Sequence, residues 1–166
     1  MARRRLCLEE LVERGDGTTM IISVIGGHEC TDEIAALSFE VGRVIAENGH
    51  ILACGGLTGV MEHVCRGAKS AGGTTIGILP TTDKKDANRY VDIVIPTGIG
   101  LARNMIVVLS GDVVVAVGGS FGTLSEIAYA LQFHKKVFGL ETKWHVTDDV
   151  EMLDSASDLD ERLKRL

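Results

Sequence analysis

The hydrophobic pattern of the chain is organised around residues 113–117, an unbroken run of valine and alanine (VVVAV). A strand without polar alternation is normally buried on both faces, as in a parallel sheet that helices cover on both sides. A glycine-rich turn (GGSFG, residues 118–122) follows directly, and apolar residues then recur at helical spacing up to Leu131. This order of buried strand, glycine turn and helix predicts an α/β fold.

The same pattern occurs earlier in the chain. Apolar strands are predicted over residues 19–25, 50–54, 74–79 and 91–95, each followed by glycine or proline. Helices are predicted between the first three strands because apolar residues recur every three or four positions, and Thr31 is suited to cap the first helix. Strands that alternate with helices predict a parallel sheet with right-handed crossovers. The expected architecture is α/β, a Rossmann-like three-layer sandwich with a central, mostly parallel sheet.

The later segments follow weaker patterns. The helix after Gly100 is expected to bury one apolar stripe, formed by Ala102, Met105, Ile106 and Leu109. Residues 136–140 are predicted to form a sixth strand. The acidic tail, residues 148–161, is predicted to be a surface helix with a few apolar anchors.

We expect residues 1–18 to form an N-terminal arm and residues 19–166 to form one domain that binds a nucleotide or phosphate group. The arm is amphipathic at best and is interrupted by Gly15 and Gly17. Residues 81–90 are polar and mixed in charge, which favours either a mobile loop over a site or a merely solvated connection.

Composition excludes several classes of function. A net charge of −6 and a pI near 5.3 give no global field for nucleic acid or an anionic membrane, and 4% aromatic residues argue against a base-stacking surface. No stretch of about 18 apolar residues and no signal peptide are evident. Widely spaced cysteines and histidines match no metal-site pattern, so we expect a cytoplasmic protein with reduced thiols and no metal.

Four turns are expected to meet beyond the carboxyl ends of the strands, where open α/β sheets bind ligands. Glycine turns at helix N-termini present backbone N–H groups to anions. None of the turns matches the dinucleotide fingerprint or the P-loop. The predicted phosphate- or ligand-binding residues are Gly26, Gly27, Gly55, Gly56, Thr58, Gly59, Gly119, Ser120, Phe121, Gly122 and Thr123.

Arg103 and Glu126 are the candidate catalytic residues, and each has a simpler explanation. Arg103 begins a helix at the predicted ligand edge, where its guanidinium could bind phosphate, but a single arginine is most often an exposed partner in a salt bridge. Glu126 could orient a ribose hydroxyl, activate water or stabilise a positively charged sugar carbon. It could also simply stabilise the dipole of its own helix.

The chain resembles the LONELY GUY superfamily over residues 19–145. The resemblance rests on three segments: 55–80, Arg103-Asn104 and 119–126. It implies a Rossmann-like fold, a homodimer or homotetramer, and no required cofactor. The best-known members are phosphoribohydrolases, which cleave nucleoside 5′-monophosphates to the free base and ribose 5-phosphate. Another branch, the molybdenum cofactor carrier proteins, binds the phosphorylated pterin without chemistry.

Two functions therefore follow from the resemblance. The hydrolase motif PGGxGTxxE keeps Glu126 here but has Gly118 for proline and Ser120 for its second glycine, and the catalytic Arg-Lys pair becomes Arg103-Asn104. Retained Arg103 and Glu126 favour a hydrolase acting on a bound nucleoside monophosphate. Asn104, Ser120 and Leu57, which replaces a third glycine, favour a carrier of molybdopterin or its molybdenum form.

Overall fold

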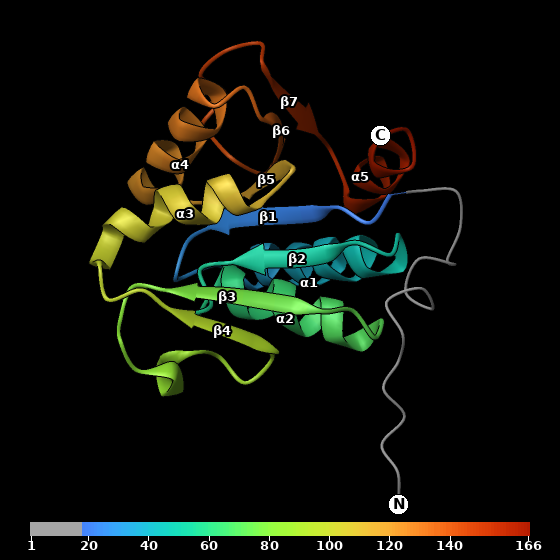
Figure 1. The fold of residues 1–166 in the computed structure, drawn as a ribbon. Coiled ribbons are helices and arrows are strands. Elements are labelled where there is room, and N and C mark those ends of the chain that lie inside the picture. Colours follow the sequence, from blue (N-terminus) through green and yellow to red (C-terminus); the bar gives the residue numbers. More distant parts are fainter. Residues whose placement is uncertain (1–17) are drawn as a thin grey trace, which may run out of the picture.

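A computed structural model describes residues 18–166, which form one seven-stranded sheet with helices on both faces (Figure 1). All neighbouring strands are parallel, in the order β4-β3-β2-β1-β5-β6-β7. The predicted α/β, Rossmann-like sandwich is confirmed. Most of the predicted arm, residues 1–17, lies outside the described residues. The strands are β1 (Ile21–Gly26), β2 (Ile51–Cys54), β3 (Thr75–Leu79), β4 (Ile93–Pro96), β5 (Val113–Val117), β6 (Lys136–Leu140) and β7 (Val150–Leu153).

The helices lie in two layers. In Figure 1, α3 and α4 lie in front of the sheet, whereas α1 and α2 lie behind it. Helix α5 packs against α1, and Asn48 at the end of α1 donates to Asp160 of α5 at 2.7 Å. The helices are α1 (Asp32–Glu47), α2 (Val60–Ser70), α3 (Arg103–Ser110), α4 (Phe121–Gln132) and α5 (Ala156–Leu163), with short 3₁₀ turns η2 (Lys84–Asp86) and η3 (Gly100–Ala102).

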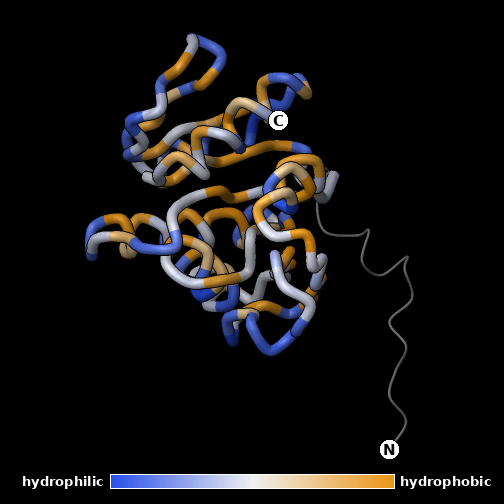
Figure 2. The backbone as a smooth tube through the Cα atoms, turned by 90° about the vertical axis from the view of Figure 1, so that its left-hand side faces the viewer, coloured by the Kyte–Doolittle hydropathy of each residue, from blue (hydrophilic) through white to orange (hydrophobic). Residues whose placement is uncertain are grey.

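The hydrophobic pattern accounts for the two halves of the core. Every residue of β5 is buried, as its unbroken apolar run predicts. Val113, Val115 and Val117 pack in the cluster on the α1–α2 side, whereas Val114 and Ala116 pack in the cluster on the α3–α4 side. In Figure 2 the hydrophilic segments lie mainly in the outer loops, and hydrophobic segments gather toward the middle. Thr31 caps α1 as predicted, because its side chain accepts from the N–H of Ile34.

Two expectations about the fold are wrong. Helix α3 buries Val107 and Val108, while Met105 and Leu109 of the predicted stripe are 39% and 45% exposed. Because α3 is apolar on nearly every side, spacing alone could not identify the face that meets the sheet. The acidic tail contains a strand, β7, before α5. Residues 150–153 form this strand by pairing in parallel with β6, and Val150 and Leu153 at its two ends are buried.

The order of the strands positions the site. The chain passes from β1 through β2 and β3 to β4, and then returns through α3 to place β5 on the other side of β1. Crossovers therefore diverge between β1 and β5, and ligands bind at such switch points in open α/β sheets. β1, β2, β3 and β4 all end on the left in Figure 1.

Candidate functional site

A cavity of about 260 Å³ lies beyond the carboxyl ends of β1 and β5. All four turns that the sequence directs to this edge contribute to its walls. Its glycine and polar lining comes from Gly26, Gly27, His28, Gly55, Arg103, Asn104, Ser120, Gly122, Thr123 and Glu126. The volume lies slightly below that of typical small-molecule pockets, so it suits one compact ligand.

Three buried polar side chains form the chemical centre of this cavity. Arg103, at the first position of α3, is only 6% exposed, and Glu126 and Thr123 on α4 are 6% and 2% exposed. The Nε atom of Arg103 and the hydroxyl of Thr123 are buried without a hydrogen-bond partner. The same holds for Nδ1 of His63 and Nε1 of Trp144, which lie outside the cavity lining, so Arg103 and Thr123 are the two of these four residues that line the cavity.

Arg103 and Glu126 affect the pKa of each other without forming a direct ion pair. Among the ion pairs within residues 18–166, none joins these two side chains. Burial raises the pKa of Glu126 to about 8, although the Arg103 charge acts in the opposite direction. Burial also lowers the pKa of Arg103, against the effect of Glu126. At pH 7 the centre therefore carries a guanidinium and a neutral carboxyl group, which together favour an anion.

Glycines leave room for this centre. A Cβ at Gly55 would overlap the guanidinium of Arg103, and a Cβ at Gly119 would overlap the side chain of Thr123. Gly119 also has a φ of +99°, a conformation that side chains disfavour. The two glycine turns therefore fix where Arg103 and Thr123 lie.

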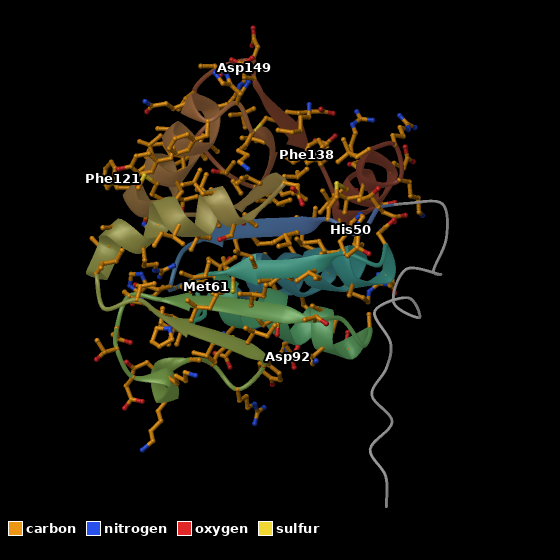
Figure 3. All side chains as sticks on the ribbon, in the orientation of Figure 1. His50, Met61, Asp92, Phe121, Phe138 and Asp149 are labelled. Carbon is orange, nitrogen blue, oxygen red and sulfur yellow. The ribbon has the colours of Figure 1, made fainter. Side chains whose placement is uncertain are left out.

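Five of the predicted ligand residues lie outside the cavity walls, and most of them support the turns. Gly56 has a φ of +72° and donates its N–H to the sulfur of Cys54. Thr58 donates to the carbonyl of His28 at 3.0 Å and so ties the first two turns together. Phe121 is 79% exposed and points outward from α4, at the left of Figure 3, where its ring contacts Trp144. The remaining two are Gly59, the N-cap of α2, and Gly119.

Sequence reasoning did not identify the apolar wall of the cavity. It consists of Val24, Ile25, Leu57, Met61, Pro80 and Leu101. In the sequence these residues have the features of ordinary core or turn positions. Their one distinguishing feature is that they lie near the end of a strand, after it, or within or just after a glycine turn. The wall suits the apolar or aromatic part of a ligand whose anionic group reaches Arg103.

The polar segment 81–90 reaches the second glycine turn. Asn88 donates its side-chain amide to the carbonyl of Leu57 at 2.8 Å and its backbone N–H to the carbonyl of Gly56 at 2.9 Å. Through Asn88 this segment is hydrogen-bonded to the second glycine turn, so it is more than a solvated connection between two strands.

The two ends of α2 provide a test of the turn geometry. Gly59 and Gly72 have similar positive φ values, +65° and +73°, but a Cβ at Gly59 would overlap the backbone of His28, whereas a Cβ at Gly72 has no neighbour within 4 Å. We expect Gly72→Ala to lower the free energy of unfolding by about 1–2 kcal/mol. Gly59→Ala should add roughly 1–3 kcal/mol of overlap to that cost. Denaturant unfolding of both variants measures the difference, and equal losses would contradict the close approach of the two turns.

The described residues do not meet the requirements of a three-residue metal site or of a membrane-spanning helix. Within residues 18–166, no three histidine, cysteine or acidic side chains lie close enough to hold a metal ion. Over the same residues, no helix is both long and apolar enough to span a membrane.

This arrangement is that of an α/β protein with a cavity at the switch point of its parallel sheet. Residues 19–164 match the SLOG cluster4 family, and the chain belongs to this family. An uncharacterised protein of Archaeoglobus fulgidus is 50% identical over 123 residues, which cover 74% of this chain and 80% of that protein.

Two solved structures with known ligands are similar over nearly the whole chain. The molybdenum cofactor binding protein of Rippkaea orientalis is 40% identical, with a TM-score of 0.84 over 89% of this chain and 97% of that one. The molybdenum cofactor carrier protein of Chlamydomonas reinhardtii is 37% identical, with a TM-score of 0.80 over 90% and 98%. The resemblance predicted from the sequence, on the carrier side of the superfamily, is confirmed.

Proposed function

We propose that this protein binds the molybdenum cofactor, a phosphorylated pterin, and carries it without changing it chemically. One observation carries the proposal: the buried Arg103 guanidinium and Thr123 hydroxyl face a cavity and have polar atoms without a partner in the protein. The similarity to two proteins named for binding or carrying this cofactor supports the choice of ligand.

The phosphate group would lie at the N-terminus of α4. There it would accept from the guanidinium of Arg103, the hydroxyl of Thr123 and backbone N–H groups of residues 119–123. The ring system would pack against Leu57, Met61 and the other apolar side chains of the wall. One cation and one helix N-terminus match a single phosphate group better than a longer polyphosphate.

Cleavage of a nucleoside monophosphate is the second candidate function, and the presence of both Arg103 and Glu126 at the cavity favours it. The charge state of Glu126 sets how it would act. With a pKa of about 8 its carboxyl group is mainly neutral at pH 7, so it is suited to donate a proton to a leaving base, and only its minor ionised form would take a proton from water or stabilise a positive sugar carbon. Asn104, which also lines the cavity, supplies no second cation.

The test compares the two functions on the same purified full-length protein. We expect molybdenum cofactor released from a molybdenum enzyme under anaerobic conditions to remain with the protein through gel filtration and then to reactivate the emptied enzyme. We expect AMP and other nucleoside monophosphates to yield no free base. Base release that depends on Glu126 would establish the hydrolase instead, and failure to retain the cofactor would refute the carrier.

The pH dependence of binding tests the role of Glu126. Ionisation of this carboxyl above its pKa of about 8 places a negative charge beside the phosphate, so affinity for AMP, used as a probe, should fall above that pH. Glu126→Gln should bind like wild type at pH 7 and keep its affinity above pH 8. Isothermal titration at both pH values measures this, with the exposed Glu29→Gln as the control for loss of one charge. An equal decline of AMP affinity in all three proteins would show that the pH dependence arises from a group other than Glu126.

We also propose that the protein forms a homo-oligomer through the α3–α4 layer. Large apolar side chains are exposed there on α3 and α4: Met105, Leu109, Phe121, Tyr129 and Phe133. Ile93 and Ile95 of β4 are 49% and 42% exposed and pair with Ile76 and Ile78, whose side chains belong to the α3–α4 side of the core. This α3–α4 face therefore continues across an uncovered part of the sheet.

The lack of outward charge on the two helices of this face supports a second copy of the chain as the partner. The only acidic or basic residues of α3 and α4 are Arg103 and Glu126, and both are buried in the site. In contrast, α1 carries five such residues: Asp32, Glu33, Glu40, Arg43 and Glu47. An uncharged apolar face is complementary to itself, as a two-fold interface requires, and offers nothing to an oppositely charged partner.

A further inference from the structure

Two buried thiols lie directly beneath the anion site. Cys54 is the last residue of β2 and Cys65 lies in α2, and their sulfur atoms are 3.5 Å apart. Both side chains are fully buried. Gly55, the residue after Cys54, lines the cavity and packs against the guanidinium of Arg103. The dithiol is therefore one residue away from the wall of the site.

The surroundings make the two thiols unequal. The hydrogen bond between the two sulfur atoms lowers the pKa of Cys54 against the effect of burial, and the N–H of Gly56 at 3.3 Å and the charge of Arg103 also lower it. The same sulfur–sulfur hydrogen bond and burial raise the pKa of Cys65. Cys54, which accepts from the N–H of Gly56, is thus placed to react first, and Cys65, 3.5 Å away, is the thiol placed to react with it afterwards.

We propose that Cys54 and Cys65 form a reversible disulfide in the presence of a small peroxide, and that this modification alters the anion site above them. The Cys54 thiolate attacks one oxygen of hydrogen peroxide, which breaks the O–O bond, forms a sulfenic acid and releases hydroxide that takes up a proton as water. The Cys65 sulfur then attacks the Cys54 sulfur and expels the second oxygen as water. The two thiols lose two electrons in all, and the peroxide gains them.

The bond would constrain the segment that carries the second glycine turn. The disulfide closes residues 54–65 into a ring that contains Gly55 and Gly56. Bond formation shortens the 3.5 Å separation of the two sulfur atoms and changes the contact between the Cys54 sulfur and the N–H of Gly56, which donates to it in the reduced protein. Because Arg103 packs against Gly55, displacement of this turn changes the position of the guanidinium. The effect on ligand binding rests on the proposed function, whereas formation of the disulfide does not.

Mass spectrometry tests the modification directly. The full-length Cys7→Ser, Cys30→Ser variant retains only the two thiols in question, and Cys54 and Cys65 fall in the same tryptic peptide, residues 44–66. After treatment with hydrogen peroxide and then N-ethylmaleimide, we expect this peptide to be unalkylated, lighter by two hydrogen atoms, and restored by dithiothreitol. In a Cys65→Ser version of that variant, which keeps a hydrogen-bond donor beside Cys54, Cys54 should instead stop at the sulfenic acid. Full alkylation, or oxygen addition without loss of two hydrogens when both thiols are present, would overturn the proposal.

The second measurement tests the effect on the site. Using inorganic phosphate as the probe, we expect the oxidised variant to bind at least about fivefold more weakly than the reduced one, the lower end of typical coupling between sites. Unchanged affinity would overturn this part of the proposal. Failure of the reduced protein to bind phosphate would count against the proposed function, and the mass of the peptide would still decide whether the disulfide forms.

Discussion

Arg103→Met is expected to abolish binding of a phosphorylated ligand and, at the same time, to raise the temperature at which the free protein unfolds. Hydrogen bonds to a charged group contribute about 1.5–3 kcal/mol each, so loss of even one weakens binding about 10- to 150-fold. The free protein, in contrast, gains from the change. Its guanidinium is 6% exposed, has a buried Nε without a partner and faces a neutral carboxyl group. Burying a charge without a paired partner is costly, so replacing it by an apolar side chain removes that cost from the free protein.

Two controls make this result specific to the site. Arg103→Lys keeps the charge but loses the planar fork, so it should bind more weakly than wild type and more tightly than Arg103→Met. Arg66→Met removes an exposed arginine that lies over the ring of Phe39 and should leave ligand binding unchanged. Calorimetry of the free proteins and titration with AMP measure both effects. A variant at Arg103 that binds normally would show that the anion is held elsewhere.

The loss of binding and the gain in stability expected for Arg103→Met follow from one cause. A buried charge that the protein itself does not pair lowers the stability of the empty protein and is available to a ligand. The same holds for the hydroxyl of Thr123, which lies under Gly119 without a partner. Stability and binding should therefore change in opposite directions at both positions.

The sequence was sufficient to predict the sheet and the location of the site. Strands such as residues 113–117 are recognisable because a run of valines has no other stable place than a sheet covered on both faces. The parallel order then requires that the turns after β1, β2 and β5 end at one edge, whatever their sequence. For this reason Gly27, Gly55 and Ser120 could be predicted to lie together, and they line one cavity.

Burial and charge state could not be predicted in the same way. Arg103 has the simple expectation of an exposed ion pair, but η3 turns the chain so that its side chain lies beneath the glycine turn at residue 55. The raised pKa of Glu126 arises from burial by segments far apart in the sequence, and no local pattern contains it. The prediction of the buried face of α3 is wrong for a related reason. This helix is apolar on several sides, and which side is buried depends on neighbours that lie far away in the sequence.

Leu109→Glu is expected to convert the protein from an oligomer into a folded monomer. Leu109 is 45% exposed in the single chain, so a glutamate there can reach water and should cost the monomer little. In an assembly through the α3–α4 face, the same carboxylate would be buried without a partner. Such a charge costs about 3–5 kcal/mol, which raises the dissociation constant roughly 150- to 5,000-fold. Sedimentation velocity over a range of protein concentrations measures this shift.

Ala36→Glu is the matched control, because it adds the same charge at an exposed position of α1, on the other side of the sheet. It should leave the assembly unchanged. A wild-type protein that sediments as a monomer at all concentrations would refute the interface. If Ala36→Glu dissociated the oligomer and Leu109→Glu did not, the contact would lie on the α1–α2 layer.

The α3–α4 face and the proposed anion site use the same two helices, and their only acidic and basic side chains point into the cavity. Because both charges line the cavity, the outward faces of α3 and α4 carry none, so the proposed binding and the proposed assembly would depend on the same two helices.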